Sequence, residues 1–310
     1  MSTVAEICTA LRAVEECTVF MHHRPDGDTV GSAAALGLCL QKLGKRVHFA
    51  CSDPVTPRYA DLLPAPLTQT PAGTLIAVDI AAPDMGGRFE EYVKQADIVI
   101  DHHGSNPGYG KLNLVCPEAA ACGEVVYDII RRLMPLDQAM AEALYVAVST
   151  DTGCFLHGNT TPHTHRVAAE LMEVGLDVTA LNRKLFVIKS RACLMVRNRL
   201  LDTLELSRDG KLATLVLSLS TIEELGATED DLENIAGLGM NLEGICAAAT
   251  LRQTGEREYK VSLRSDGSLN AATVCKALGG GGHAMAAGCT LQGEEAACRA
   301  AIIAEMEKQL

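Results

Sequence analysis

His22-His23-Arg24-Pro25-Asp26-Gly27-Asp28-Thr29-Val30-Gly31-Ser32 connects an expected strand to an expected helix in the N-terminal half of the chain. It follows a short apolar run at residues 18–21 and precedes an alanine- and leucine-rich run at residues 33–43 that is typical of a helix. The connecting loop places His22 and two aspartates, Asp26 and Asp28, within seven residues. Because carboxylate oxygens and imidazole are ligands of divalent cations, this loop suits a metal ion.

The size and charge of the chain limit its class of function. With 310 residues, of which 48% are hydrophobic, it can form two domains that each have a core. The formal net charge of -12 argues against a protein that coats long nucleic acid, since no lysine- or arginine-rich block offsets the acidic residues. A small anionic substrate stays compatible with this charge if metals or a local basic cluster neutralise it.

The cysteines and the N-terminus bear on cellular location. The 12 cysteines are scattered without a Cys-x-x-Cys spacing, which is typical of a reduced intracellular protein with buried thiols. The N-terminus lacks the basic start and apolar run of a signal peptide, and no stretch approaches the ~18 apolar residues of a membrane span. We therefore expect a cytoplasmic protein with no membrane contact.

Strand and helix patterns alternate through the first half of the chain. Helices are expected at residues 4–15, 31–43 and 87–95, and strands at residues 18–21, 46–51, 74–79 and 97–100. Residues 54–71 hold five prolines and are expected to be mostly loop. Alternation at this spacing predicts an α/β domain with a mainly parallel sheet and flanking helices.

Potential metal ligands follow three of the expected strands. His22 follows the first strand, Asp79 ends another, and a third ends in Asp101-His102-His103. Asp151 follows an apolar helix that is expected at residues 138–148. Because the functional crevice of an open parallel sheet lies beyond the carboxyl ends of its strands, these side chains are expected to converge.

Each aspartate taken singly is also typical of a turn or a helix cap. The joint pattern instead favours a site for two cations, with one carboxylate bridging between them. Oxygen and imidazole ligands without a thiolate favour manganese or magnesium, with cobalt or iron as further options, over a structural zinc ion.

These motifs resemble those of a known family. The matching residues are His22-x-x-Pro25-Asp26-x-Asp28, Asp79, Asp101-His102-His103 and Asp151-Thr152-Gly153, in the order typical of the DHH phosphoesterase family. Towards the C-terminus, Gly279-Gly280-Gly281-Gly282-His283 with Ala286-Ala287-Gly288 is similar to the glycine-rich signature of the DHH-associated second domain. The resemblance spans residues 22–288.

Within this family the chain is most similar to the bifunctional oligoribonucleases and 3'-phosphoadenosine 5'-phosphate (PAP) phosphatases, the nanoRNases. Residues 101–106, 151–155 and 261–265 carry this likeness. It implies a metal-dependent enzyme that hydrolyses short oligoribonucleotides to mononucleotides, PAP to AMP and phosphate, or both. A cyclic or linear dinucleotide phosphodiesterase remains an alternative, and an inorganic pyrophosphatase or a non-catalytic nucleotide sensor ranks below it.

The resemblance also implies roles for individual residues. Two divalent cations would share Asp79. Manganese is the expected ion, and magnesium and cobalt are the alternatives. The expected ligands are His22, Asp26 and Asp79 for the first ion, and Asp28, Asp79, His102 and Asp151 for the second. His103 would contact the substrate or protonate the leaving group, and Asp101 would orient a histidine. Which histidine of the pair His102 and His103 binds metal stays open.

The second half of the chain predicts a linker and a smaller domain. The expected parts are a catalytic domain at residues 1–180, a helical linker at 181–205, with one long helix over 181–201, and a mixed-sheet α/β domain at 206–310. The smaller domain has expected strands at residues 213–219, 245–252 and 260–264, a loop and helix at 221–238, and a helix at 271–278.

The glycine run of the smaller domain reads either as a flexible loop or as an anion site. Glycine permits close backbone approach, so exposed amides there could hold a substrate phosphate. The substrate-binding candidates are Arg264, Gly280, Gly281, Gly282 and His283. Binding on both domains predicts short RNA or nucleotide bisphosphates rather than long duplexes as substrates. A homodimer is expected by family analogy alone.

Overall fold

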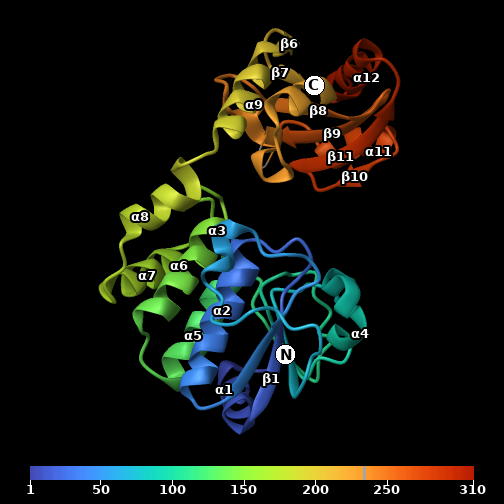
Figure 1. The fold of residues 1–310 in the computed structure, drawn as a ribbon. Helices are drawn as coiled ribbons and strands as arrows, with labels where there is room; N and C mark the ends of the chain where they lie inside the picture. The colour runs from blue at the N-terminus through green and yellow to red at the C-terminus, as the bar shows by residue number, and fades with distance from the viewer. Residues whose placement is uncertain (233–234) are drawn as a thin grey trace. The chain divides into compact units, whose positions relative to one another are not determined.

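The computed structural model describes residues 1–232 and 235–310. The chain forms two compact units, Met1–Ile188 and Lys189–Leu310, which are shown in Figure 1. Their boundary falls inside the linker expected at residues 181–205. The long helix predicted there is interrupted, because α8 (Val178–Asn182) continues into a π-helical turn at Arg183–Val187 and a new helix, α9 (Arg191–Asp202), begins after Ser190. The Ser190 side chain accepts a hydrogen bond from the Cys193 amide and caps α9.

The first unit contains a parallel five-stranded sheet in the order β2-β1-β3-β4-β5. The strands are β1 (Glu16–Phe20), β2 (Arg46–Ala50), β3 (Thr74–Val78), β4 (Ile98–Asp101) and β5 (Leu112–Val115). The predicted α/β class with a mainly parallel sheet is confirmed. Strand β5 was not predicted from the sequence, since only Leu114 in it is buried and the apolar pattern is weak.

Alternate residues of the strands enter two cores, one on each face of the sheet. Val19 and Ile76 pack in the larger core, whereas Phe20 and Ala77 pack in the smaller one. Residues of α1 (Val4–Ala13), α2 (Gly27–Lys42), α5 (Cys122–Leu133), α6 (Gln138–Asp151) and α7 (Pro162–Glu173) join the larger core. The smaller core includes Val93 of α4 (Glu90–Val93). Burial on both faces explains why the strands read as continuous apolar runs.

The start of α2 and the end of α6 differ from their predicted limits. The prediction started the first of them at residue 31, but α2 starts at Gly27 because Asp26 accepts hydrogen bonds from the Asp28 and Thr29 amides and acts as its N-cap. Asp28 therefore lies in the first helical turn rather than in a loop. Helix α6 extends to Asp151, three residues beyond the predicted end at residue 148.

The second unit contains a mixed six-stranded sheet in the order β10-β11-β9-β8-β7-β6. Its strands are β6 (Glu205–Ser207), β7 (Leu212–Leu217), β8 (Ala247–Gly255), β9 (Glu258–Ser265), β10 (Gly281–Gly282) and β11 (Ala286–Gln292). Only β7 and β8 pair in parallel among these strands. Residues of α11 (Ala271–Ala277) and α12 (Glu295–Glu307) complete its main core. The predicted smaller mixed-sheet domain is confirmed.

The loop and helix predicted at residues 221–238 have other bounds in the structure, because the helix begins before this segment. Helix α10 covers Leu219–Leu225 and ends at Gly226, which adopts the left-handed conformation common at helix C-termini. Short 3-10 turns follow at Glu229–Leu232 and Ile235–Asn241. Residues 233–234 of the predicted segment lie outside the described residues.

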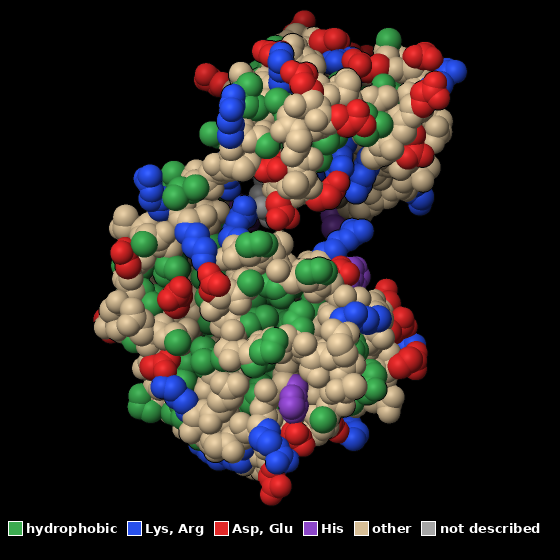
Figure 2. Space-filling view, in the orientation of Figure 1, with side chains coloured by type: hydrophobic (Ala, Val, Ile, Leu, Met, Phe, Trp, Pro, Cys, Tyr) green, Lys and Arg blue, Asp and Glu red, His purple; other side chains and the backbone are tan. Residues whose placement is uncertain are grey.

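Figure 2 shows lysine and arginine side chains interspersed with aspartate and glutamate on the visible face of both units. Among the described residues, no helix is long and apolar enough to cross a bilayer.

Candidate metal centre

The expected ligands of the first unit meet beyond the carboxyl ends of its strands. His22 follows β1, Asp79 follows β3 directly, and β4 ends at Asp101 with His102 and His103 next in the chain. Asp28 joins them from the first turn of α2, and Asp151 from the last residue of α6. We call the set His22, Asp26, Asp28, Asp79, His102, His103 and Asp151 the metal cluster.

Asp79 lies at the centre of the metal cluster. Its Oδ2 atom is 3.6 Å from Nε2 of His22, and its Oδ1 atom is 3.6 Å from Nε2 of His102. Three groups of side chains bring ligand atoms within 4.8 Å of one another. The first group is His22, Asp26 and Asp79, and the second is Asp79, His102 and His103. The third is Asp28, His102 and Asp151. Asp79 belongs to two of these groups, which is the arrangement expected of a bridging carboxylate.

The remaining distances link each histidine to further carboxylates. Nε2 of His22 lies 3.6 Å from Oδ1 of Asp26. Nε2 of His102 lies 3.7 Å from Oδ2 of Asp28 and 3.8 Å from Oδ2 of Asp151. These separations are too long for hydrogen bonds, but they suit donor atoms that each lie roughly 2.1 Å from a shared cation.

The polar groups present fit a metal ion. Asp79 is only 2% exposed, and its Oδ1 atom has no hydrogen-bond partner among the described residues. A buried carboxylate oxygen without a donor is costly unless a cation or a proton compensates it. The backbone of Asp79 also adopts φ 58°, a conformation that a residue with a side chain rarely adopts, and such strain is concentrated at functional sites.

The pKa values of the aspartates in the metal cluster also favour a bound cation. Burial raises the pKa of Asp28 and Asp79 well above the usual range for aspartate, and neighbouring aspartates raise both further. Burial likewise raises the pKa of Asp151. Crowded carboxylates of this kind resist ionisation without a cation, and a divalent cation reverses the effect because its charge favours their ionised form.

Asp28 is held by donors that the sequence analysis missed. Its Oδ2 accepts a hydrogen bond from the Cys122 amide at 2.7 Å, and its Oδ1 accepts from the Gly123 amide and the Ser32 hydroxyl, both at 2.9 Å. The two amides belong to the start of α5, where backbone donors are free to bind an anion. Backbone amides leave no residue signature, so no sequence signal identifies this contact.

The ring orientations distinguish His102 from His103. Nδ1 of His102 donates to the Ala119 carbonyl at 3.2 Å, so Nε2 points to the carboxylates. His22 behaves alike, with Nδ1 donating to the His23 carbonyl at 2.7 Å. A histidine whose other nitrogen donates to a carbonyl is typical of a metal ligand. Nδ1 of His103 instead donates to Oδ1 of Asp101 at 2.8 Å.

Asn106 completes the support of His103, and the sequence analysis gave it no role of its own. Its Nδ2 donates to Oδ2 of Asp101 at 2.7 Å and to the Ile80 carbonyl at 3.1 Å. Burial opposes ionisation of Asp101, but hydrogen bonds from His103 and Asn106 outweigh it and lower the Asp101 pKa. The hydrogen bond to Asp101 in turn raises the pKa of His103.

Comparison with known proteins identifies the family. Residues 16–148 match the model of the DHH family, N-terminal domain, and residues 209–310 match the DHHA1 domain. Over 304 residues the chain is 37% identical to the bifunctional oligoribonuclease and PAP phosphatase NrnA of Thermus thermophilus, with 94% of this chain and 89% of that protein covered. The chain belongs to the DHH family.

Two further similarities extend over almost the whole DHH chain. It is 26% identical over 309 residues to the bifunctional oligoribonuclease and PAP phosphatase NrnA of Bacillus subtilis, covering 97% of both proteins. Its fold matches a crystal structure of an exopolyphosphatase-related protein from Bacteroides fragilis with a TM-score of 0.89 at 21% identity, covering 98% of this chain and 95% of the other.

The expected substrate-binding residues lie at one end of the DHHA1 sheet. Arg264 is on β9 in register with Ala286 of β11, and Ala286 exchanges backbone hydrogen bonds with His283 on its other side. Gly281 and Gly282 form the short edge strand β10. An ideal Cβ at Gly280 would lie 2.1 Å from the Gly288 carbonyl oxygen, so this position requires glycine for packing.

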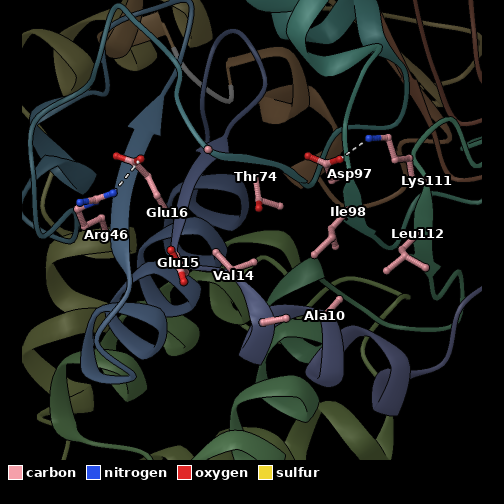
Figure 3. A pocket seen from close by; sticks show the side chains of 12 residues that line it. Ala10, Val14, Glu15, Glu16, Arg46, Thr74, Asp97, Ile98, Lys111 and Leu112 are labelled. Carbon is pink, nitrogen blue, oxygen red and sulfur yellow. Dashed lines mark hydrogen bonds and ion pairs between the residues drawn. The ribbon is translucent and has the colours of Figure 1, made fainter.

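A separate cavity of about 670 Å³ lies at the opposite, amino end of the DHH-domain strands. Figure 3 shows two ion pairs within it, between Arg46 and Glu16 at 3.2 Å and between Lys111 and Asp97 at 2.7 Å. No residue of the metal cluster lines it. Because its principal charges pair with one another, this cavity is not the metal centre.

Proposed function

We propose that this chain is a metal-dependent phosphoesterase that hydrolyses short oligoribonucleotides to mononucleotides, PAP to AMP and phosphate, or both. The position of Asp79 between His22 and His102, with an unpaired buried oxygen, carries the proposal. The NrnA relatives, which are named for both activities, support this choice of substrates.

The metal cluster would hold two divalent cations that share Asp79. His22 and Asp26 would complete the first site, and Asp28, His102 and Asp151 the second. Such cations supply an activated water and neutralise the oxygens of a phosphate. Oxygen and imidazole donors favour manganese, with magnesium or cobalt as substitutes.

His103 would act as the acid of the reaction. Asp101 fixes its ring through Nδ1 and raises its pKa, so the protonated ring is favoured. His103 is half-exposed, which gives a substrate access to it. It would protonate the alcohol oxygen that leaves when the phosphorus is attacked. Asp101 positions this ring and does not itself react.

The DHHA1 domain would bind a second part of the substrate. Arg264 suits a phosphate because its guanidinium forms charge-assisted hydrogen bonds. Gly281, Gly282 and His283 are exposed residues, and β11 lies between them and Arg264. This assignment rests on the family resemblance and on the shared register of these residues. The homodimer expected by analogy stays a prediction, and the molar mass in solution measures it.

A substrate panel tests the proposal. We would compare RNAs of two to five nucleotides, PAP, a linear dinucleotide, a cyclic dinucleotide and pyrophosphate, each with manganese and with a chelator. Manganese-dependent release of mononucleotides from the short RNAs, or of phosphate from PAP, is the expected result. Turnover of the cyclic dinucleotide or pyrophosphate alone would contradict the substrate assignment, and equal turnover in chelator would contradict the metal requirement.

A further inference from the structure

The ligands proposed for the second cation are supported by one short stretch of backbone. We call this stretch, residues 119–123, the α5 entry segment, because it leads into the first turn of α5. The Ala119 carbonyl accepts a hydrogen bond from Nδ1 of His102 at 3.2 Å. The two amides at the end of the segment donate to the carboxylate of Asp28 at 2.7 and 2.9 Å. One segment therefore holds two of the three ligands that would belong to the second cation alone.

Asn159 links the third of these ligands, Asp151, to the same segment. Its Nδ2 atom donates to the Ala120 carbonyl at 2.9 Å and to the Asp151 backbone carbonyl at 3.3 Å. Ala120 lies 39 residues away from Asn159 in the chain, so this contact joins two separate parts of the fold. Asp28, His102 and Asp151 are thus all tied to a single structural element.

The loop that carries Asn159 is fixed at both ends. Before Asn159, the amides of Leu156 and His157 donate to the Thr152 carbonyl at 3.0 and 2.9 Å, which folds the loop back onto the end of α6. After it, Thr161 is the N-cap of α7, and its side chain accepts hydrogen bonds from two amides of the first helical turn. The backbone therefore presents the Asn159 amide group to the two carbonyls from a defined position.

Glu124 holds the α5 entry segment from the side of the helix. The residue is 1% exposed, and its Oε2 atom accepts a hydrogen bond from the Ala120 amide at 3.2 Å. Ala120 is therefore fixed at its amide by Glu124 and at its carbonyl by Asn159. Removing the Asn159 side chain would release this carbonyl and disconnect Asp151 from the segment.

The two ligands that would belong to the first cation alone are held by other contacts. Nδ1 of His22 donates to the carbonyl of the next residue at 2.7 Å. Oδ1 of Asp26 accepts from two amides in the first turn of α2 at 3.0 and 3.1 Å. Among the described residues, neither Asn159 nor the α5 entry segment forms a hydrogen bond with His22 or Asp26. A change at Asn159 should therefore affect the second cation and not the first.

We propose that Asn159 is a positioning residue that sets the affinity of the second cation, by holding the Asp151 backbone against the α5 entry segment. This inference rests on the proposed function, because it presupposes two cations that share Asp79. Residues that support a metal ligand through hydrogen bonds fix its orientation, and their loss weakens metal binding. Asn159 acts in this way on the backbone that carries Asp151 and, through Ala120, on the segment that holds Asp28 and His102.

Manganese titration of the full chain tests the proposal, with the free Mn²⁺ signal in electron paramagnetic resonance as the readout. We expect the unaltered chain to bind two ions. Asn159→Ala should lower the affinity of one ion about 10- to 100-fold, the usual loss when a residue that supports a ligand is replaced. The affinity of the other ion should stay unchanged.

A ligand variant identifies which ion is affected. Asp151→Asn weakens a ligand of the second site only, so the ion that it retains would occupy the first site. Adding Asn159→Ala to this variant should not change the affinity of the retained ion, because both changes act on the other site.

His157→Ala is the matched control. Nδ1 of His157 contacts the same Asp151 carbonyl at 3.3 Å, but His157 forms no hydrogen bond with the α5 entry segment in the described part of the chain. It should therefore keep both manganese affinities. Asn159 and His157 are exposed, so both variants are expected to fold, and circular dichroism of the metal-free chains checks this.

Unchanged manganese affinities in Asn159→Ala, an equal loss for both ions, or an equal loss in His157→Ala would each overturn the proposal. If the unaltered chain bound only one ion, the two-cation site of the proposed function would be wrong, and this inference with it. Two bound ions with unaffected affinities in Asn159→Ala would instead overturn this inference alone.

Discussion

Oδ1 of Asp79 lies 3.6 Å from Nε2 of His102 and has no hydrogen-bond partner in the described part of the chain. Its other oxygen lies equally far from Nε2 of His22. Both distances exceed that of a hydrogen bond, yet each is short enough for two donor atoms to share one cation. The carboxylate is thus placed to connect two cation sites.

Replacing Asp79 with asparagine tests this bridge. Asp79→Asn keeps the shape of the side chain but changes one ligand oxygen into an amide that cannot bind a cation. We expect metal content to fall by at least one ion per chain, and the rate of PAP or RNA hydrolysis to fall more than about 100-fold. This loss exceeds the usual loss of activity when a residue that only hydrogen-bonds to a metal ligand is replaced. Elemental analysis and initial rates measure these effects. Asp84→Asn, at an exposed position, is the control, and unchanged metal content in Asp79→Asn would refute the bridge.

Asn106 is predicted to position His103 through Asp101. Asn106→Ala removes the 2.7 Å hydrogen bond to Oδ2 of Asp101, so kcat should fall about 10- to 100-fold while metal content stays unchanged. The matched control is Tyr109→Phe, because the Tyr109 hydroxyl donates to the same Ile80 carbonyl as Asn106 and not to Asp101. If Tyr109→Phe lowered kcat as much as Asn106→Ala, the loss would reflect the Ile80 contact and not the orientation of His103.

Arg264 is predicted to bind substrate phosphate without affecting the metals. Arg264→Gln should raise KM for short RNA about 10- to 100-fold, because it removes a charge-assisted hydrogen bond. Metal content should match that of the unaltered chain. Arg257→Gln removes an equal charge in the same domain, where Arg257 pairs with Glu294 at 3.2 Å, and serves as the comparison. Equal KM values for the two variants would argue against a specific role for Arg264.

Asp97 predicts a pH-dependent contribution to stability. Its carboxylate accepts from the Lys111 ammonium at 2.7 Å and the Leu75 amide at 2.9 Å, and these bonds outweigh burial and lower its pKa. A lowered folded-state pKa means that the stabilisation is complete above the unfolded pKa of about 3.9 and is lost as pH falls through the folded value. Asp97→Asn should therefore lower the free energy of unfolding at pH 7 by about 1 kcal/mol.

The difference between Asp97→Asn and the unaltered chain should shrink below about pH 4, where Asp97 of the unfolded chain begins to bind a proton, and should shrink further until the pH falls through the lower pKa of the folded carboxylate. Urea unfolding across pH measures it. Asp84→Asn, whose side chain is exposed, should show no such trend. A difference that stayed constant from neutral to acidic pH would show that the charge of Asp97 does not stabilise the fold.

Gly31 is predicted to be required where α2 packs on α6. An added Cβ would lie 2.3 Å from the Ala143 carbonyl oxygen and 2.9 Å from the Ala147 amide nitrogen, and neither backbone atom can move without shifting α6. Gly31→Ala should therefore destabilise the chain by roughly 2 to 3 kcal/mol. Thermal or urea unfolding measures the loss. Gly158→Ala, where no atom lies within 4 Å of the added Cβ, should be nearly neutral.

The amino-acid sequence alone was sufficient to predict the parallel sheet and the end of the sheet where the acids gather. Strands β1, β3 and β4 are short apolar runs, and His22, Asp79 and Asp101 follow or end them directly. Both features can be read from residues that are neighbours in the chain. A strand buried on both faces must be apolar, and the residue that follows the strand lies at its carboxyl end. The motif order was likewise sufficient to indicate the family.

Other features of the metal cluster were decided only by tertiary structure. His102 and His103 are adjacent in the chain, and their different orientations depend on the Ala119 carbonyl, 17 residues from His102, and on the Asp101 carboxylate. Asp28 is held by the Cys122 and Gly123 amides, 94 and 95 residues away. Backbone donors and acceptors are the same in every residue type, so only the packing of α2 against α5 brings these groups within hydrogen-bond distance.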